Sequence, residues 1–247
     1  MKAGRTRILT KICSSVQIYA ISDFHLPGGT DKPMDIFGAH WEGHFEQIAA
    51  DWQEKVLPQD IILIPGDISW AITLEEAIPD LNRIGALPGK KILVRGNHDY
   101  WWNSISRLRS VLPEGMYALQ NDALLLDDVV FCGTRGWLLS DKQDPQDEKI
   151  YQRELQRLEM SLNCAQRIGP DKRKVVLIHY PPVDTSGVDS AFSELLERFQ
   201  VHDVVYGHIH GAGTKTAFQG EKNGVRYHFV SCDGLSFKLY QLPTVDI

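Results

Sequence analysis

Short apolar runs alternate with amphipathic segments along most of the chain. Several runs rich in Val, Ile and Leu have the length and composition of buried β-strands. They occupy residues 17–22, 60–66, 90–96, 128–133, 174–179 and 203–207. Apolar side chains recur at helical spacing in the segments between them, residues 41–56, 73–84, 146–168 and 190–200. Because near-continuous apolar strands are buried on both faces, this alternation predicts an α/β fold in which both faces of the sheet are covered.

Local signals refine two of these predictions. Thr73 and Glu76 have the spacing of a capping box, which predicts that a helix begins directly after Thr73. Near the C-terminus, two β-rich runs at residues 225–231 and 236–242 are separated by the tetrapeptide Cys-Asp-Gly-Leu. We therefore predict that these two runs form an antiparallel hairpin.

The composition is that of an ordinary globular protein. The chain has 247 residues, of which 43% are hydrophobic and 23% charged, so it can bury a sizeable core. This length suits one large domain. We expect a single domain over residues 1–247, with residues 1–15 as a candidate N-terminal extension.

Charge and cysteine content argue against several classes of protein. The net charge of −6 disfavours a broad nucleic-acid surface. The four cysteines lie far apart and form no C-x-x-C pair, which suits inert thiols in a reducing compartment. Lys11 interrupts the N-terminal apolar stretch, and no other run approaches membrane-spanning length. We expect a cytoplasmic protein with no membrane segment, and the sequence leaves its oligomeric state open.

Polar side chains follow the apolar runs at the points where the predicted strands end. These strand-end residues are Asp23, His25, Asp67, Asn97, His98, Asp99, His179, His208 and His210. In open α/β sheets, ligands bind at the carboxyl edge of the strands. We therefore expect these side chains to gather on one rim of the fold.

The residue types at the strand ends suit metal ions. Imidazoles, carboxylates and one carboxamide, with no thiol among them, form a mixed nitrogen and oxygen site for Mn, Fe, Zn or Ni. The set is too large for one ion with an open position, but it suits two divalent ions that share a bridging carboxylate. Each pattern alone is weak, since Gly-Asp is often a plain turn. Their joint occurrence in one chain favours a metal site.

The order of these patterns resembles a known family. The signature of the calcineurin-like metallophosphoesterases has five blocks, and the chain is similar to it at Asp23-x-His25, Gly66-Asp67, Gly96-Asn97-His98-Asp99, His179 and Gly207-His208-x-His210. The resemblance spans residues 18–210 and shows no departure at a ligand position. It implies a four-layer αββα sandwich with a dinuclear metal centre.

The resemblance also implies a role for each strand-end residue. The first ion would be held by Asp23, His25, Asp67 and His210, and the second by Asp67, Asn97, His179 and His208. Asp67 would bridge the two ions. His98 would not bind metal but would act as the general acid that protonates the leaving oxygen, and Asp99 would hold its imidazole in place.

The implied activity is hydrolysis of a phosphate-ester substrate. The resemblance implies a metal-dependent phosphoric ester hydrolase that cleaves phosphomonoester or phosphodiester bonds by metal-activated hydroxide. One alternative is a non-catalytic metal-binding scaffold or interaction module, which would be expected to lose ligands or His98. Another is a UDP-diacylglucosamine-type pyrophosphohydrolase, a group that more often carries Arg where His98 stands.

Three further segments have open roles. Trp101 and Trp102 are expected to pack a following helix onto the sheet, although one of them could instead wall a substrate pocket. The segment 27–44, rich in Gly, His and Trp, either covers the site or lies in solvent. Residues 211–216 resemble a P-loop, but Thr214 stands where that loop requires Gly before Lys215, so we expect no nucleotide triphosphate site there.

Overall fold

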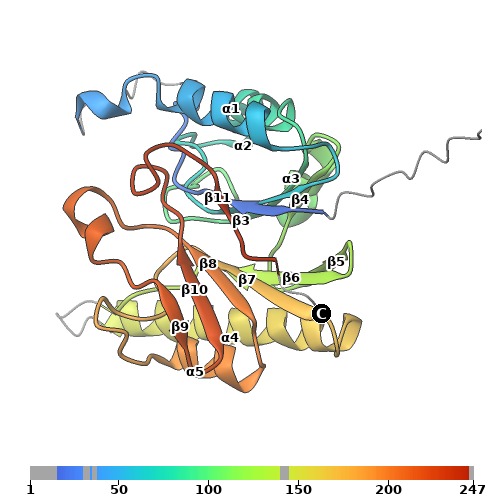
Figure 1. The fold of residues 1–247 in the computed structure, drawn as a ribbon, viewed down its shortest axis with the longest axis vertical. Helices are drawn as coiled ribbons and strands as arrows, with labels where there is room; N and C mark the ends of the chain where they lie inside the picture. The colour runs from blue at the N-terminus through green and yellow to red at the C-terminus, as the bar shows by residue number, and fades with distance from the viewer. Residues whose placement is uncertain (1–15, 30–33, 35–37, 140–144, 245–247) are drawn as a thin grey trace, which may run out of the picture.

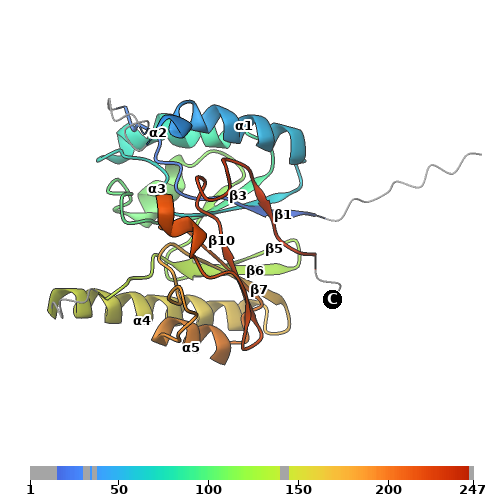
Figure 2. The same cartoon turned by 60° about the vertical axis from the view of Figure 1, so that its left-hand side comes forward.

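Two β-sheets pack face to face and helices cover their outer faces (Figures 1 and 2). The computed structural model describes residues 16–29, 34, 38–139 and 145–244. The candidate N-terminal extension therefore lies outside the described residues. The layer order is helix, sheet, sheet, helix, and the predicted four-layer αββα sandwich is confirmed.

The first sheet has the strand order β11-β1-β2-β3-β4. Its strands are β1 (Ile18–Ala20), β2 (Ile61–Pro65), β3 (Lys90–Val94), β4 (Met116–Ala118) and β11 (Tyr240–Gln241). The strands β1 to β4 are parallel, and β11 pairs antiparallel with β1. The outer face of this sheet is covered by α1 (His44–Lys55), α2 (Leu74–Gly85) and α3 (Ile105–Val111).

The second sheet has the strand order β5-β6-β7-β8-β10-β9. Its strands are β5 (Ala123–Leu126), β6 (Val129–Thr134), β7 (Arg173–Ile178), β8 (Asp203–Tyr206), β9 (Gly220–Lys222) and β10 (Val225–Phe229). The strands β6, β7, β8 and β10 run parallel. The outer face is covered by α4 (Pro145–Ile168) and α5 (Ala191–Arg198).

The layered core explains why the central strands read as continuous apolar runs. In β2, Ile61 and Leu63 belong to the cluster between the sheets, whereas Ile62 and Ile64 belong to the cluster under the helices. All four side chains are fully buried. A strand that is buried on both faces cannot alternate apolar and polar residues, so the composition of the runs follows from their position.

The predicted helices are present, with small shifts at their ends. Thr73 caps α2, and both hydrogen bonds of the predicted capping box with Glu76 form. The predicted helix at residues 41–56 begins only at His44, because Gly43 has a φ of 59° and separates α1 from the short 3₁₀ turn η2 (Ala39–Trp41). The helix expected after the two tryptophans is α3, whereas the short strands β4, β5 and β9 were not predicted, since they span too few residues for a clear period.

The predicted C-terminal hairpin is wrong. β10 lies in the second sheet between β8 and β9, whereas β11 lies in the first sheet beside β1. The segment between them crosses from one sheet to the other, because Cys232 and Phe237 are buried in the core of the first sheet and its helices. In this part of the chain a hairpin forms between β9 and β10. Its turn is Asn223-Gly224, with φ angles of 50° and 80°, a pair typical of two-residue hairpin turns.

The described cysteines and helices agree with the composition of the chain. Cys132 and Cys232 are buried, and burial raises the pKa of the Cys132 thiol to about 12, as expected of an inert core cysteine. Across residues 16–29, 34, 38–139 and 145–244, no helix combines the length and apolar character needed to cross a bilayer.

A buried ionic cluster anchors the amino-terminal end of β8. Asp203 is fully buried and accepts hydrogen bonds from Arg173 at 2.7 and 2.9 Å, from Arg226 at 2.8 Å and from His228 at 2.9 Å. Burial alone would raise the pKa of Asp203, but these donors outweigh it and lower that pKa to about 2. The cluster therefore joins β7, β8 and β10 through one ionised carboxylate.

We expect Asp203→Ala to lower the free energy of unfolding by about 3–5 kcal/mol, because it leaves the buried Arg173 guanidinium without its partner. Because the folded-state pKa lies below the ordinary value of 3.8, the stabilisation is complete above about pH 4 and lost as the pH falls toward 2. Urea unfolding at several pH values measures both effects. The control Glu159→Ala removes an exposed pair with Arg198 and should cost at most about 1 kcal/mol. If the two substitutions lower the free energy of unfolding equally, Asp203 does not anchor β8 through a buried ionic cluster.

Candidate metal centre

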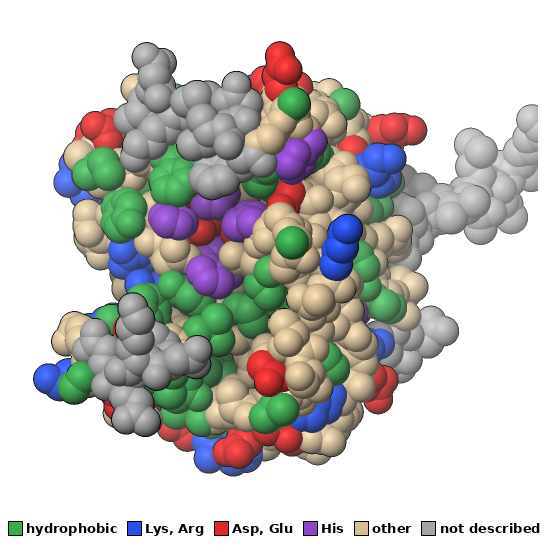
Figure 3. Space-filling model, turned by 90° about the vertical axis from the view of Figure 1, so that its left-hand side faces the viewer, with side chains coloured by type: hydrophobic (Ala, Val, Ile, Leu, Met, Phe, Trp, Pro, Cys, Tyr) green, Lys and Arg blue, Asp and Glu red, His purple; other side chains and the backbone are tan. Residues whose placement is uncertain are grey.

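The strand-end residues gather where the strands of both sheets end. Figure 3 shows histidine side chains crowded around acidic groups in the middle of this face. The structure brings together all seven side chains predicted as ligands, namely Asp23, His25, Asp67, Asn97, His179, His208 and His210. The parallel strands β1, β2, β3, β7 and β8 deliver them to one rim, as expected for the carboxyl edges of α/β sheets.

Four of these residues have a left-handed backbone. The φ angles are 61° at Asp23, 46° at His25, 52° at Asp67 and 72° at His208. Such angles in residues other than glycine cost about 1–3 kcal/mol each and concentrate at functional sites. Hydrogen bonds between the strand ends hold the backbone in place, for example from Asp23 N–H to the Gly66 carbonyl at 3.1 Å.

The glycines of the motifs allow the carboxylates to approach the neighbouring chain. A Cβ atom on Gly96 would lie 2.1 Å from Asp67 Oδ1, and one on Gly207 would lie 2.2 Å from Asp23 Oδ2. Either contact is far closer than non-bonded atoms can come. The glycine before Asn97 and the glycine before His208 are therefore required by the positions of the two aspartates.

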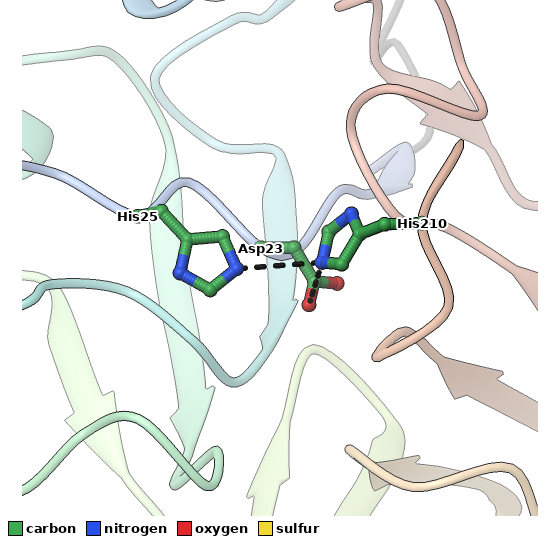
Figure 4. A group of neighbouring side chains, drawn as sticks. All are labelled: Asp23, His25 and His210. Carbon is green, nitrogen blue, oxygen red and sulfur yellow. Dashed lines mark hydrogen bonds and ion pairs between the residues drawn. The ribbon is translucent and has the colours of Figure 1, made fainter. Parts of the chain in front are cut away.

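The first group of side chains is formed by Asp23, His25 and His210 (Figure 4). His210 Nε2 lies 3.3 Å from Asp23 Oδ1 and 3.3 Å from His25 Nε2. Asp23 Oδ2 accepts hydrogen bonds from the hydroxyls of Ser22 and Ser231, the latter at 2.9 Å. These bonds fix the carboxylate so that Oδ1 faces the two imidazoles.

The second group is formed by Asn97, His179 and His208. Asn97 Oδ1 lies 2.7 Å from His179 Nε2 and 3.0 Å from His208 Nδ1, and the two ring nitrogens are 3.3 Å apart. His179 Nδ1 lies 3.0 Å from the Pro65 carbonyl, which can only accept, so this nitrogen carries the proton. Nε2 is the nitrogen of His179 that faces the centre.

Asp67 stands between the two groups. Its Oδ2 atom lies 3.7 Å from His25 Nε2 and 3.4 Å from His179 Nε2. Its other oxygen, Oδ1, accepts a hydrogen bond from the backbone N–H of His98 at 2.9 Å. One carboxylate oxygen thus faces imidazoles of both groups, which is the position that a bridging ligand requires.

The protonation of the imidazoles is tied to the carboxylates. Burial lowers the pKa of His179, but the Asp67 carboxylate outweighs it and raises that pKa to about 9. Burial likewise opposes protonation of His210, yet hydrogen bonds to Asp23 and Asp233 raise its pKa to about 10. Desolvation lowers the pKa of His25 and of His208 to about 4. The imidazoles and carboxylates of this cluster are therefore strongly coupled, and binding of a divalent cation would displace protons from them.

The geometry and chemistry of these groups fit divalent metal ions. Carboxylate Oδ, carboxamide Oδ and imidazole nitrogen atoms converge at 2.7–3.7 Å from one another on either side of Asp67. The set Asp23, His25 and His210 and the set Asp23, Asp67 and His179 each present ligand atoms close enough for one ion. Nitrogen and oxygen donors without thiolate suit Mn, Fe, Zn or Ni.

Asp233 is a further candidate site residue, which the sequence patterns did not indicate. Its Oδ1 atom lies 3.1 Å from His210 Nδ1, and its Oδ2 atom accepts the Gly211 N–H at 2.9 Å. A carboxylate behind a metal-binding imidazole fixes the orientation of the ring. The sequence offered only the Cys-Asp-Gly-Leu tetrapeptide, which was interpreted as a hairpin turn.

We expect Asp233→Ala to weaken Mn²⁺ binding by about 10- to 100-fold, because His210 loses the group that orients its ring. Asp233→Asn retains an acceptor oxygen and should have a smaller effect. Titration of each variant with Mn²⁺ by calorimetry gives the affinities. Unchanged affinity in Asp233→Ala would show that His210 is held in place without this carboxylate.

His98 lies beside the centre and outside both groups of side chains. Its ring centroid is 4.4 Å from that of Trp70 and 5.6 Å from that of His25. Burial lowers the pKa of His98. Its Nδ1 atom is buried and has no hydrogen-bond partner among the described residues. The ring is therefore positioned by packing against Trp70.

The predicted contact between Asp99 and the His98 imidazole is not found among the described residues. Both Asp99 oxygens are occupied by other donors, at 2.7–3.2 Å: the backbone N–H groups of Asp67, Ile68, Ser69 and Gly96 and the indole N–H of Trp101. The carboxylate instead binds the end of β2 to the end of β3. This correction makes Asp99 an anchor for the loops that carry Asp67 and Asn97.

The two adjacent tryptophans pack in the core, as the first interpretation predicted. Trp101 and Trp102 are each 1% exposed and belong to the cluster beneath the helices of the first sheet. Trp41 and Trp70 are the tryptophans that lie beside the first group of side chains. They line a cavity of about 370 Å³ together with His25, His98 and His210.

The described part of the segment 27–44 borders this cavity. His40 and Trp41 line it, so this part of the segment lies at the site. The motif that resembles a P-loop forms the 3₁₀ turn η3 (Gly211–Lys215) after β8. It does not lead from a strand into an α-helix, which agrees with the expectation that it binds no nucleotide triphosphate.

Comparisons with known proteins agree with this architecture. A family model described as calcineurin-like phosphoesterase matches residues 16–212. Among solved structures, phosphopantetheinyl hydrolase from Mycobacterium tuberculosis is 16% identical with a TM-score of 0.55, covering 92% of this chain and 96% of that chain. The protein TT1561 of Thermus thermophilus is 15% identical with a TM-score of 0.55, covering 92% of this chain and 98% of that chain. No curated protein matches the chain significantly. At these identities the two structures establish a shared fold.

Proposed function

Because the chain belongs to the calcineurin-like phosphoesterase family, we propose that it is a metal-dependent phosphoric ester hydrolase with a dinuclear centre. The observation that carries this proposal is the position of Asp67. One of its oxygens lies within 3.7 Å of an imidazole nitrogen in each of the two groups of side chains. A shared carboxylate offsets the repulsion between two neighbouring cations.

The ligands divide between the two ions as the family pattern implies. The first ion would be held by Asp23, His25, Asp67 and His210, and the second by Asp67, Asn97, His179 and His208. When bound, a pair of divalent ions supplies positive charge to the phosphoryl oxygens and makes water a better nucleophile. Asp233 and the Pro65 carbonyl keep His210 and His179 in the orientation that binding needs.

His98 is the residue placed to move a proton. It is not a ligand in this assignment, and it lines the cavity beside His25 and His210. A substrate whose phosphate lies at the centre would direct its leaving oxygen toward this ring. His98 would donate a proton to that oxygen as the bond to phosphorus breaks.

The cavity beside His98 would receive the alcohol portion of the substrate. Trp41 is almost fully buried and its ring centroid lies 5.8 Å from that of His210, while Trp70 stacks on His25 at 4.8 Å. Flat apolar walls of this kind favour an apolar or aromatic group over a small polar one. The same walls would keep bulk water away from His98.

A substrate panel tests the proposal. The full chain is reconstituted separately with Mn, Ni, Zn and Fe and assayed with phosphomonoesters and phosphodiesters that have aryl or alkyl leaving groups. We expect metal-dependent hydrolysis of at least one ester class, abolished by a chelator. If no preparation that contains two ions per chain hydrolyses any ester, the protein is a metal-binding scaffold and the proposed activity is wrong.

A further inference from the structure

A second cavity, of about 270 Å³, adjoins the metal centre and is rich in arginine. Its lining includes Arg95, Arg135, Arg153 and Arg157, with Glu154 as the only acidic residue among the described lining residues. Arg95 is separated from Asn97 by a single residue, and the Arg135 carbonyl accepts the His179 N–H at 3.0 Å. The cavity therefore lies next to the second group of candidate ligands.

The buried carboxylate of Glu154 is already satisfied. Arg157 Nη1 donates to it at 2.7 Å, Arg135 Nη2 at 3.2 Å and the Thr134 hydroxyl at 2.8 Å. Glu154 thus fixes two guanidinium groups but balances only one positive charge. Among the described residues, Arg95 and Arg153 form no ion pair, so the cavity retains a positive excess.

The arginines also retain unused hydrogen-bonding capacity. Arg135 Nε is buried and has no hydrogen-bond partner among the described residues. The hydrogen bond found for the Arg95 side chain runs from Nε to the Asp99 carbonyl at 3.1 Å. Arg95, Arg135 and Arg157 are partly buried and Arg153 is exposed, and guanidinium groups gathered around one cavity repel one another unless an anion lies between them. On the face that Figure 3 shows, basic side chains border the histidine cluster.

We propose that this arginine cavity binds a second phosphoryl group of the substrate, so that the preferred esters carry two phosphate groups. The inference rests on the proposed function for the position of the first phosphate. Planar guanidinium groups match phosphate oxygens with paired hydrogen bonds. Because two residues of extended chain span about 7 Å, an anion beside Arg95 is within reach of a short bisphosphate bound at Asn97.

Non-hydrolysable probes test the proposal by binding alone. Alkane bisphosphonates with two to six methylene groups are compared with alkyl monophosphonates of matched length, by calorimetry on the metal-loaded full chain. We expect at least one bisphosphonate to bind about 10- to 100-fold more tightly than its monophosphonate, the range of charge-assisted hydrogen bonds. The double variant Arg153→Gln/Arg157→Gln should lose this advantage and bind monophosphonates as the wild type does.

Arg167→Gln is the matched control, because Arg167 lies on the same helix α4 but contacts Cys164 and not the cavity. It should keep the full preference, and thermal melting verifies that each variant is folded. If the double variant does not fold, the single variant Arg153→Gln is used for the binding comparison. Arg153 forms no ion pair among the described residues, so its substitution should leave the fold intact. No bisphosphonate advantage at any length, or an advantage that survives in the arginine variants, would overturn the proposal.

The outcome is separable from that of the proposed function. If bisphosphonates bind as expected but no ester is hydrolysed, the anion site stands and the hydrolase assignment fails. If esters are hydrolysed without any preference for two phosphoryl groups, the hydrolase assignment stands and the second phosphate site is wrong.

Discussion

Replacing Asp67 by Asn is expected to lower kcat/KM by at least about 10³-fold for every phosphate ester, the scale of the several kcal/mol that a metal pair supplies. Asp67 Oδ2 faces His25 and His179 at 3.7 and 3.4 Å, and an amide there carries no charge to hold two cations. Metal content should fall from two ions per chain to one or none. Kinetics with elemental analysis of the same samples measures both quantities.

Asp128→Asn is the matched control for this variant. Like Asp67, Asp128 has a left-handed backbone, with φ angles of 52° at Asp67 and 69° at Asp128. In both variants the new Asn must therefore adopt a left-handed backbone conformation. Asp128 is exposed and pairs with Lys172 far from the strand-end cluster. It should leave activity and metal content unchanged. Full activity with two bound ions in Asp67→Asn would rule out the bridging role.

His98→Ala is expected to lower kcat/KM for alkyl phosphate esters by about 10²–10⁴-fold, the usual range for a general acid. Nitrophenyl esters should lose much less, because a phenolate leaves without needing a proton. Both metal ions should remain, since His98 lies outside the two groups of candidate ligands. Rates on both ester types, with metal content determined for the same preparations, provide the test.

A control histidine and two alternative outcomes complete this test. His202→Ala removes an exposed histidine that precedes β8, at the end of the strand opposite the centre, and should affect neither ester. Equal losses on both ester types in His98→Ala would mean that the ring binds phosphate and does not transfer a proton. Loss of a metal ion would mean that His98 is itself a ligand.

Much of the fold was predictable because strands that are buried on both faces consist of continuous apolar residues. β2 illustrates this, since its side chains point alternately to the neighbouring sheet and to the helices, and all are buried. The candidate ligands were predictable for a related reason. Parallel strands end at one rim, so polar residues that follow apolar runs come together in space even when they are distant in sequence.

Which strands pair with each other, and which side chains contact each other, was harder to predict from the sequence. β10 and β11 follow each other closely in sequence yet belong to different sheets, and periodicity does not encode which strand lies alongside. Asp99 is adjacent to His98 in sequence but bonds to backbone groups between Asp67 and Ser69, which lie some thirty positions earlier. Asp233 and Trp70 reach the site through loop geometry that a single sequence does not specify.

The revised position of Asp99 changes what its substitution should do. Because Asp99 holds the ends of β2 and β3, its substitution would displace Asp67 and Asn97 together. Asp99→Asn should therefore weaken metal binding and slow the hydrolysis of both ester types. A residue that only oriented His98 would affect alkyl esters selectively. The ratio of alkyl to aryl rates therefore separates the role observed in the structure from the role inferred from the sequence.

The most direct test of the dinuclear centre is a titration of activity against bound metal. Metal-free protein is loaded with increasing amounts of Mn²⁺, bound ions are counted by elemental analysis, and hydrolysis of the best ester in the panel is measured on each sample. We expect little activity up to one ion per chain and a plateau at two. A plateau at one ion, or two bound ions without any hydrolysis, would rule out a dinuclear catalytic centre.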